Sequence, residues 1–121
     1  MLEKLKSAYK LWHQYHEKIP KTQKYSLGNR IDKLLIENIE ATATAAFLPK
    51  TEKIPWVRLA IRKTDTIKIL LAVLWETKSL DDKKYIALSE TLNEIGKMLG
   101  GWNGQLQKQN SPESENRSGK K

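Results

Sequence analysis

The chain has 121 residues, the size of one domain, and its 22 Lys and Arg side chains against 14 Asp and Glu give a formal net charge of +8. This balance favours association with polyanions or with an acidic protein surface. The absence of cysteine excludes disulfides, thiolate metal sites and a cysteine nucleophile, and it agrees with a reducing cytoplasm. No apolar stretch approaches the roughly 20 residues that span a bilayer, so we expect a soluble, cytoplasmic protein.

The N-terminal region has the apolar periodicity of an amphipathic helix, which Pro20 should end. Its stripe consists of Leu2, Leu5, Tyr9, Trp12, His16 and Ile19. After a basic connection, Ser26 is predicted to cap a second helix that ends near Pro49. The stripe of this second helix runs through Leu27, Ile31, Leu34, Asn38, Ala41, Ala45 and Leu48.

A third helix is predicted to begin close to Pro55, a residue suited to a first helical turn, and to end at about Lys78. Ser79 or Asp81 should then cap a fourth helix. The pair Gly100 and Gly101 is typical of a left-handed helix end, beyond which Trp102 would fold back onto the apolar stripe. That stripe consists of Tyr85, Leu88, Leu92, Ile95 and Leu99.

Four helices with short connections predict an all-α, antiparallel up-down four-helix bundle over residues 1–102. The remainder, residues 103–121, is polar and basic with one apolar residue, Leu106, and is predicted to be a disordered tail. Two tryptophans, Trp56 and Trp75, are not clearly accounted for by the core stripes and are candidates for an interface. Trp75 could equally complete the core beside Leu71 and Leu74.

No constellation of residues predicts catalysis. His13, His16 and Glu17 could begin a metal site, but His16 falls on the core stripe while His13 points elsewhere, so we expect no metal. Glu37 is expected to be solvated or paired with a basic residue across the bundle. Phosphate-binding loops and a nucleophile elbow are absent, so we expect a protein that is not an enzyme and has no cofactor.

Basic residues form two candidate binding clusters. Arg58 and Arg62 are one helical turn apart and share a face, with Lys63 beside them. The second cluster, in the connection before the second helix, consists of Lys18, Lys21 and Lys24. Such groups can hold RNA or DNA by its phosphates with little sequence preference. They can equally be solvated faces, or pair with acidic groups of a neighbouring subunit or a protein partner.

Two runs carry a resemblance to a known family. They are Tyr25 to Ile31 (YSLGNRI), which opens the second predicted helix, and Ile95 to Trp102 (IGKMLGGW), which closes the fourth. With four helices, the chain resembles the accessory variability determinant proteins of diversity-generating retroelements. These belong to a wider group of four-helix-bundle proteins that includes those encoded in intervening sequences of 23S ribosomal RNA genes.

The resemblance implies a bacterial or phage protein that assembles as a homopentameric barrel. It also implies a non-catalytic accessory protein that binds the reverse transcriptase and template RNA or cDNA through basic surfaces and supports mutagenic cDNA synthesis. Within the motifs, Arg30 could form an intersubunit ion pair or stay in solvent, and it is also a candidate for binding nucleic acid or a partner. Gly28 and Gly96 are expected to allow close packing against a neighbouring helix. The alternative is a helical scaffold that binds an acidic protein partner and has no role with nucleic acid.

Overall fold

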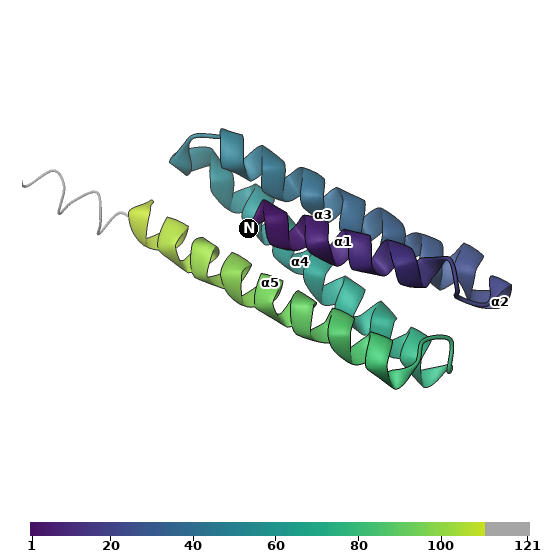
Figure 1. The fold of residues 1–121 in the computed structure, drawn as a ribbon. Helices are drawn as coiled ribbons and strands as arrows, with labels where there is room; N and C mark the ends of the chain where they lie inside the picture. The colour runs from purple at the N-terminus through teal and green to yellow at the C-terminus, as the bar shows by residue number, and fades with distance from the viewer. Residues whose placement is uncertain (111–121) are drawn as a thin grey trace, which may run out of the picture.

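The computed structural model describes residues 1–110, and within them four long helices are joined by short connections (Figure 1). The long helices are α1 (Leu2–His16), α3 (Asn29–Phe47), α4 (Lys50–Glu76) and α5 (Asp82–Gln109). A short helix α2 (Lys21–Gln23) and a π-helical turn η1 (Lys24–Gly28) lead directly into α3. The predicted all-helical four-helix bundle is therefore confirmed. None of the helices in this part of the chain has the length and hydropathy needed to cross a membrane.

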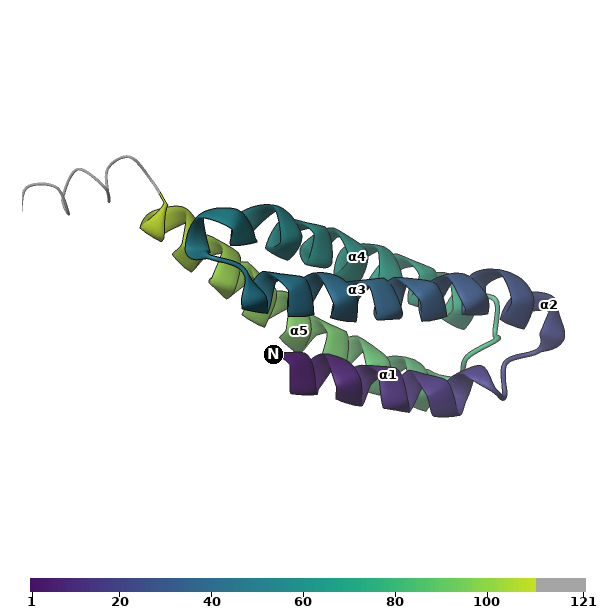
Figure 2. The same cartoon turned by 90° about the horizontal axis from the view of Figure 1, so that it is seen from above.

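The four long helices close into a ring in which α3 lies between α1 and α4, and α5 packs on α4 and α1 (Figures 1 and 2). An ion pair between Lys4 and Glu94, and the Lys84 ammonium 5.5 Å from the centre of the Tyr15 ring, show that α1 and α5 are antiparallel. Each helix contributes fully buried apolar side chains to one core, among them Trp12, Leu35, Leu71 and Leu92.

A buried polar network fixes how α3 and α4 align. Asn38 Nδ2 donates a hydrogen bond of 2.8 Å to Thr64 Oγ1, and Thr64 Oγ1 donates one of 2.8 Å to the carbonyl of Ala60. Thr42 Oγ1 donates to Asn38 Oδ1 at 3.5 Å. An unpaired amide in this position would carry a large desolvation penalty, so sliding one helix along the other is disfavoured.

The second helix begins earlier than predicted. The Ser26 side chain does not cap it but donates weakly to the carbonyls of Thr22 and Gln23 at 3.5 Å. Helical structure starts directly after Pro20, whose carbonyl accepts from the Lys24 N–H at 2.8 Å. The Ser26 cap is therefore wrong, because the preceding proline provides an entry to the helix and the π-helical turn carries it on into α3.

Gly28, at the end of this turn, allows the close approach that the sequence predicts. A Cβ atom at Gly28 would lie 3.0 Å from Cδ2 and Nε2 of His16 in α1. The imidazole is in turn stacked on Trp12, with ring centres 5.0 Å apart. The group that lies against Gly28 is therefore the His16 ring, which packs on Trp12 on its other side and has little room to move.

The third helix starts at Lys50, and Pro55 lies beyond its first turn instead of within it. The early start is stabilised by Lys53, whose ammonium donates to the carbonyls of Ala45 and Ala46 at 2.6 and 3.3 Å. Both carbonyls lie in the last turn of α3, so one side chain ties the first turn of α4 to the helix before it. Pro55 removes a single backbone hydrogen bond near the helix start, which this anchoring offsets.

The predicted helix end at Gly100 and Gly101 is wrong, because α5 continues to Gln109 and neither glycine has a positive φ. The apolar stripe continues beyond them through Trp102, which is half-buried against the core, and Leu106, which is buried. Burial of these two side chains offsets the weak helix propensity of glycine. Residues 103–109, predicted to be disordered, are thus helical; residues 111–121 lie outside the described residues.

The α4–α5 connection agrees with the prediction at Asp81, which is the N-cap of α5 and accepts a hydrogen bond of 2.9 Å from the Lys84 N–H. Gly96, by contrast, meets no backbone of another helix. The atom nearest to its potential Cβ is the ammonium nitrogen of Lys68 at 3.3 Å, the movable end of a side chain from α4. Close helix packing therefore does not account for Gly96.

Candidate nucleic-acid interface

The seam between α3 and α4 carries the most organised group of charges. Lys63 of α4 donates a hydrogen bond of 3.1 Å to Glu37 Oε1 of α3, and the two side chains are 20% and 30% exposed. Of the two alternatives expected for Glu37, solvation or pairing with a basic residue across the bundle, the structure shows the pairing. Since Lys63 is engaged within the chain, it is less available to a ligand than its position in the sequence indicated.

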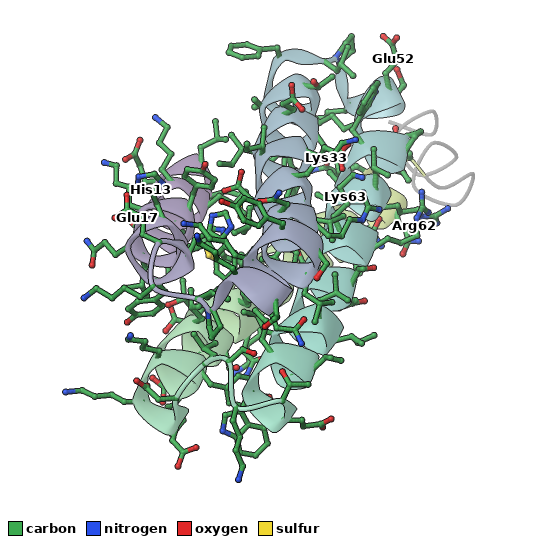
Figure 3. All side chains as sticks on the ribbon, turned by 90° about the vertical axis from the view of Figure 1, so that its right-hand side faces the viewer. His13, Glu17, Lys33, Glu52, Arg62 and Lys63 are labelled. Atoms are coloured by element: carbon green, nitrogen blue, oxygen red, sulfur yellow. The ribbon has the colours of Figure 1, made fainter. Side chains whose placement is uncertain are left out.

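Two further cations of α3 surround this ion pair. The hydrogen bond from Lys63 is the main cause that lowers the pKa of Glu37, burial opposes it, and the charges of Lys63, Lys33 and Arg30 lower it further. Three positive charges therefore act on one carboxylate. Arg30 and Lys33 are exposed and lie at the seam, where the positive charges outnumber the one carboxylate of Glu37. Figure 3 shows Lys33 beside Lys63.

Arg58 and Arg62 lie on the outer side of α4, one helical turn apart and both exposed. In Figure 3 the Arg62 side chain points away from the seam, whereas Lys63 lies along it. No ion pair holds either guanidinium within residues 1–110. Both groups are therefore free to bind phosphates or carboxylates bidentately.

The remaining predicted residues, Lys18, Lys21 and Lys24, lie where α1 ends and α2 begins, and Lys21 and Lys24 belong to helical turns instead of a loop. Lys18 and Lys21 are exposed, while Lys24 is half-buried with its ammonium 3.5 Å from the carbonyl of Glu17. The α4–α5 connection lies at the same end of the bundle (Figures 1 and 2) and adds exposed Lys78, and the first turn of α5 adds exposed Lys83. We call these five lysines the basic end.

Acidic side chains at this end are mostly engaged. Asp81 caps α5 and lies 3.8 Å from the Lys84 ammonium, and Asp82 accepts a hydrogen bond of 2.7 Å from Trp75 Nε1. Glu17 is 3.7 Å from Nε2 of His13. These contacts hold the three carboxylates in place, and of the three only Asp81 is paired with a lysine.

His13 and Glu17 also formed, with His16, the possible beginning of a metal site. In Figure 3 His13 and Glu17 lie together on the outside of α1, whereas His16 is stacked on Trp12 in the interior. The expectation that His16 faces the core and His13 does not is confirmed. No group of three or more His, Asp or Glu side chains suited to a metal ion occurs in the described part of the chain.

The structure thus distributes the predicted residues over three places: Arg30 and Lys63 at the seam, Arg58 and Arg62 on α4, and the lysine cluster at the basic end. Sequence reasoning missed Lys33, although its spacing of four residues from Glu37 is a recognisable signal. It also missed Lys78 and Lys83, which are far from Lys18 in sequence and lie at the same end of the molecule only because the bundle folds.

The family described as bAvd-like matches residues 1–106, which include all four long helices except the last turn of α5. No curated protein and no solved structure matches the chain. The match extends past Trp102, in agreement with the helix that continues there.

Proposed function

The chain belongs to the bAvd-like family of accessory variability determinant proteins, and we propose that it serves a diversity-generating retroelement by binding the reverse transcriptase and template RNA or cDNA. The family is accessory and non-catalytic in kind. The match over residues 1–106 is the observation that carries this proposal, because it covers all of the bundle except the last turn of α5. In this role the basic surfaces hold the nucleic acid and the partner enzyme performs the synthesis.

The unpaired cations support the nucleic-acid part of the proposal. Arg58, Arg62, Arg30 and Lys33 are exposed on two adjacent helices, and the net charge of the chain is +8. Exposed cations of this kind contact phosphates and do not read bases, so binding should depend strongly on salt and weakly on sequence.

Exposed apolar side chains support contacts with protein. Phe47, Ile69 and Tyr25 are 87%, 65% and 68% exposed, a large apolar area for surface positions. On α5, a Cβ atom at Gly100 or Gly101 would meet nothing within 4 Å. We propose that further copies of the chain cover part of these surfaces in a homopentamer, which would make use of glycines that otherwise weaken α5.

Charge reversal tests the nucleic-acid part. The double variant Arg58→Glu/Arg62→Glu should bind single-stranded RNA at least about tenfold more weakly than the wild type at about 0.1 M salt, with a shallower dependence on salt. Fluorescence anisotropy measures both. Lys10→Glu/Lys97→Glu is the matched control, because it reverses two exposed charges outside the three basic places. Equal losses of affinity in both variants would indicate a general effect of net charge and contradict a specific role of Arg58 and Arg62.

A nuclease-treated pull-down with the reverse transcriptase separates this function from the alternative, a scaffold for an acidic protein. Retention of the reverse transcriptase after nuclease treatment, together with RNA binding by the isolated chain, supports the proposal. Retention of an acidic partner by a chain that binds no RNA at low salt supports the scaffold. Native mass spectrometry of the full chain tests the pentamer, and a monomer at micromolar concentration would contradict it.

A further inference from the structure

Trp75, one residue before the end of α4, is an exposed aromatic side chain held in a single orientation. It is 39% exposed, and its ring stacks on Tyr85 of α5 with centres 4.8 Å apart and planes 9° from parallel. Its Nε1 donates a hydrogen bond of 2.7 Å to Asp82 Oδ1. A ring fixed by two partners loses little conformational entropy when a ligand stacks on it, so it is pre-organised for binding.

A depression of about 550 Å³ adjoins this ring at the basic end. The residues that line it are Trp75, Lys78, Leu80, Asp81, Asp82 and Lys83. Tyr85 covers one face of the indole and does not line the depression, so the part of the ring that adjoins the depression is not the face that Tyr85 covers. The volume is within the range of small-ligand sites and is sufficient for a nucleobase with its sugar.

Lys78 occupies a backbone position that suits glycine better. Its φ is 62°, and it is the one residue other than glycine with a positive φ between positions 1 and 110. It closes α4 in a Schellman motif, in which the Ser79 N–H bonds to the carbonyl of Leu74 at 2.9 Å and the Lys78 N–H bonds to that of Trp75 at 3.0 Å. A side chain in this conformation is strained. Compared with glycine, a lysine at this position therefore lowers stability but adds an ammonium group that can contact a ligand.

We propose that the depression binds an unpaired base of single-stranded nucleic acid, which stacks on the open face of Trp75 while Lys78 and Lys83 contact the flanking phosphates. This inference rests on the proposed function and specifies the form of nucleic acid that the basic end takes. Every base has a flat face that can stack on an indole, whereas a base inside a duplex is not available.

The charges around the ring favour this ligand over the apolar anchor of a protein partner. Four of the six lining residues are charged, and the single aliphatic one, Leu80, is 3% exposed. The carboxylates keep their negative charge but are held in place, Asp82 by the indole N–H and Asp81 by the start of α5 and by Lys84. Lys78 and Lys83 are exposed, so their ammonium groups can turn toward a ligand. An aromatic face beside two cations matches a base with its phosphates better than an aliphatic side chain.

Three tryptophan variants test the stacking. The probes are a fluorescently labelled oligouridine of about 15 nucleotides and an RNA duplex of the same length, bound to the full chain. Trp75→Leu should lower affinity for the oligouridine about tenfold and leave affinity for the duplex within about twofold. Trp75→Phe should retain most of the affinity. Trp56→Leu is the matched control, because Trp56 lies near the opposite end of α4 and is 38% exposed.

Lys78→Gly separates a binding role from a structural one. Glycine relieves the positive φ, so the melting temperature should rise by roughly 2 to 5 °C. Affinity for the oligouridine should nevertheless fall, and the slope of log K against log salt should decrease by about 0.7, the value for one phosphate contact on a single strand. A higher melting temperature with unchanged binding would overturn the role of Lys78.

The remaining outcomes distinguish this inference from the proposed function. A wild-type chain that binds neither probe at low salt overturns both. If the wild type binds both probes and Trp75→Leu weakens both equally or neither, the stacking site is overturned while nucleic-acid binding stands. If Trp75→Leu abolishes nuclease-resistant capture of the reverse transcriptase and leaves RNA affinity unchanged, the depression is a protein contact and the inference is overturned.

Discussion

The runs Tyr25–Ile31 and Ile95–Trp102 both place glycine inside helical structure, but the bundle uses these glycines differently. At Gly28 an added Cβ would lie 3.0 Å from the His16 ring and 3.4 Å from the carbonyl oxygen of Gln23. At Gly100 and Gly101 it would meet no atom within 4 Å. The first glycine is therefore required by the packing of α1 on the start of α3, and the other two are not required by any contact inside the described chain.

The difference shows that glycines inside a helix can have two different causes. One is a close contact within the chain, and the other must be sought outside it. Glycine inside a helix costs about 1 kcal/mol relative to alanine. The close contact with His16 explains this cost at Gly28. On α5 the cost has no explanation within one chain, and the proposed assembly with further copies would supply one.

The largest effect within either run is expected at Trp102. Its ring is half-buried against the core, and the Lys53 ammonium lies 5.8 Å from the ring centre. Trp102→Ala should lower the free energy of unfolding by about 2 kcal/mol, less than the roughly 3–5 kcal/mol expected for the fully buried Trp12. Urea denaturation of both variants provides the comparison. Unchanged stability with a loss of RNA binding would assign Trp102 to the interface instead of the core.

Gly28→Ala should destabilise the bundle by about 1–2 kcal/mol, because the strain against the His16 ring exceeds the gain in helix propensity. Denaturant unfolding of a double-mutant cycle with His16→Ala measures the coupling. In the His16→Ala background the substitution should become neutral or stabilising. A loss of the same size in both backgrounds would show that another contact requires the glycine.

Gly100→Ala/Gly101→Ala should have the opposite sign. With open space at both positions, the single chain should be stabilised by about 1–2 kcal/mol in total, whereas the homo-oligomer should be weakened if another copy approaches α5 closely. Thermal melting and native mass spectrometry measure the two effects on the same samples. An oligomer that remains intact would place the subunit contact elsewhere on the surface.

The smallest effect concerns Arg30, which belongs to the first run and acts at the seam. The pKa of Glu37 is lowered, first by the hydrogen bond from Lys63 and further by the charges of Lys63, Lys33 and Arg30. A carboxyl with a lowered pKa stabilises the fold above its unfolded pKa, and this contribution disappears as the pH falls through the folded value. Glu37→Gln should therefore reduce the loss of stability between about pH 6 and pH 3, and Arg30→Gln should reduce it less.

Unfolding curves recorded across this pH range check the order of the two variants. A pH dependence identical to that of the wild type in Glu37→Gln would mean that other carboxyl groups dominate acid unfolding. A larger change for Arg30→Gln than for Glu37→Gln would show that Arg30 acts on a different acid.

Much of the bundle could be predicted because its signals are local. The spacing of apolar residues identifies four amphipathic helices, and Asp81 is a recognisable N-cap. The errors arose where tertiary contacts outweigh local propensity. Gly100 and Gly101 resemble a helix end, but burial of Trp102 and Leu106 carries α5 onward.

The sequence predicts which basic residues belong to the candidate site, but only partly how their side chains are arranged in space. Arg58 and Arg62 share a face because they are four residues apart on one helix, which the sequence shows directly. That Lys63 pairs with Glu37 across the seam was open, since solvation of Glu37 was equally compatible with its spacing. The orientation of Trp75 was also unpredictable, because it depends on Tyr85 and Asp82 of the next helix.

The sequence by itself determined the helical class, the excess of positive charge and the residues that share a helix face, since these follow from composition and a period of 3.6 residues. The tertiary structure alone decided which cations have an acidic partner, which glycine is crowded and which lysines meet at the basic end. These properties depend on how far one helix is displaced along another. Buried contacts between distant residues, such as Asn38 with Thr64, set that displacement.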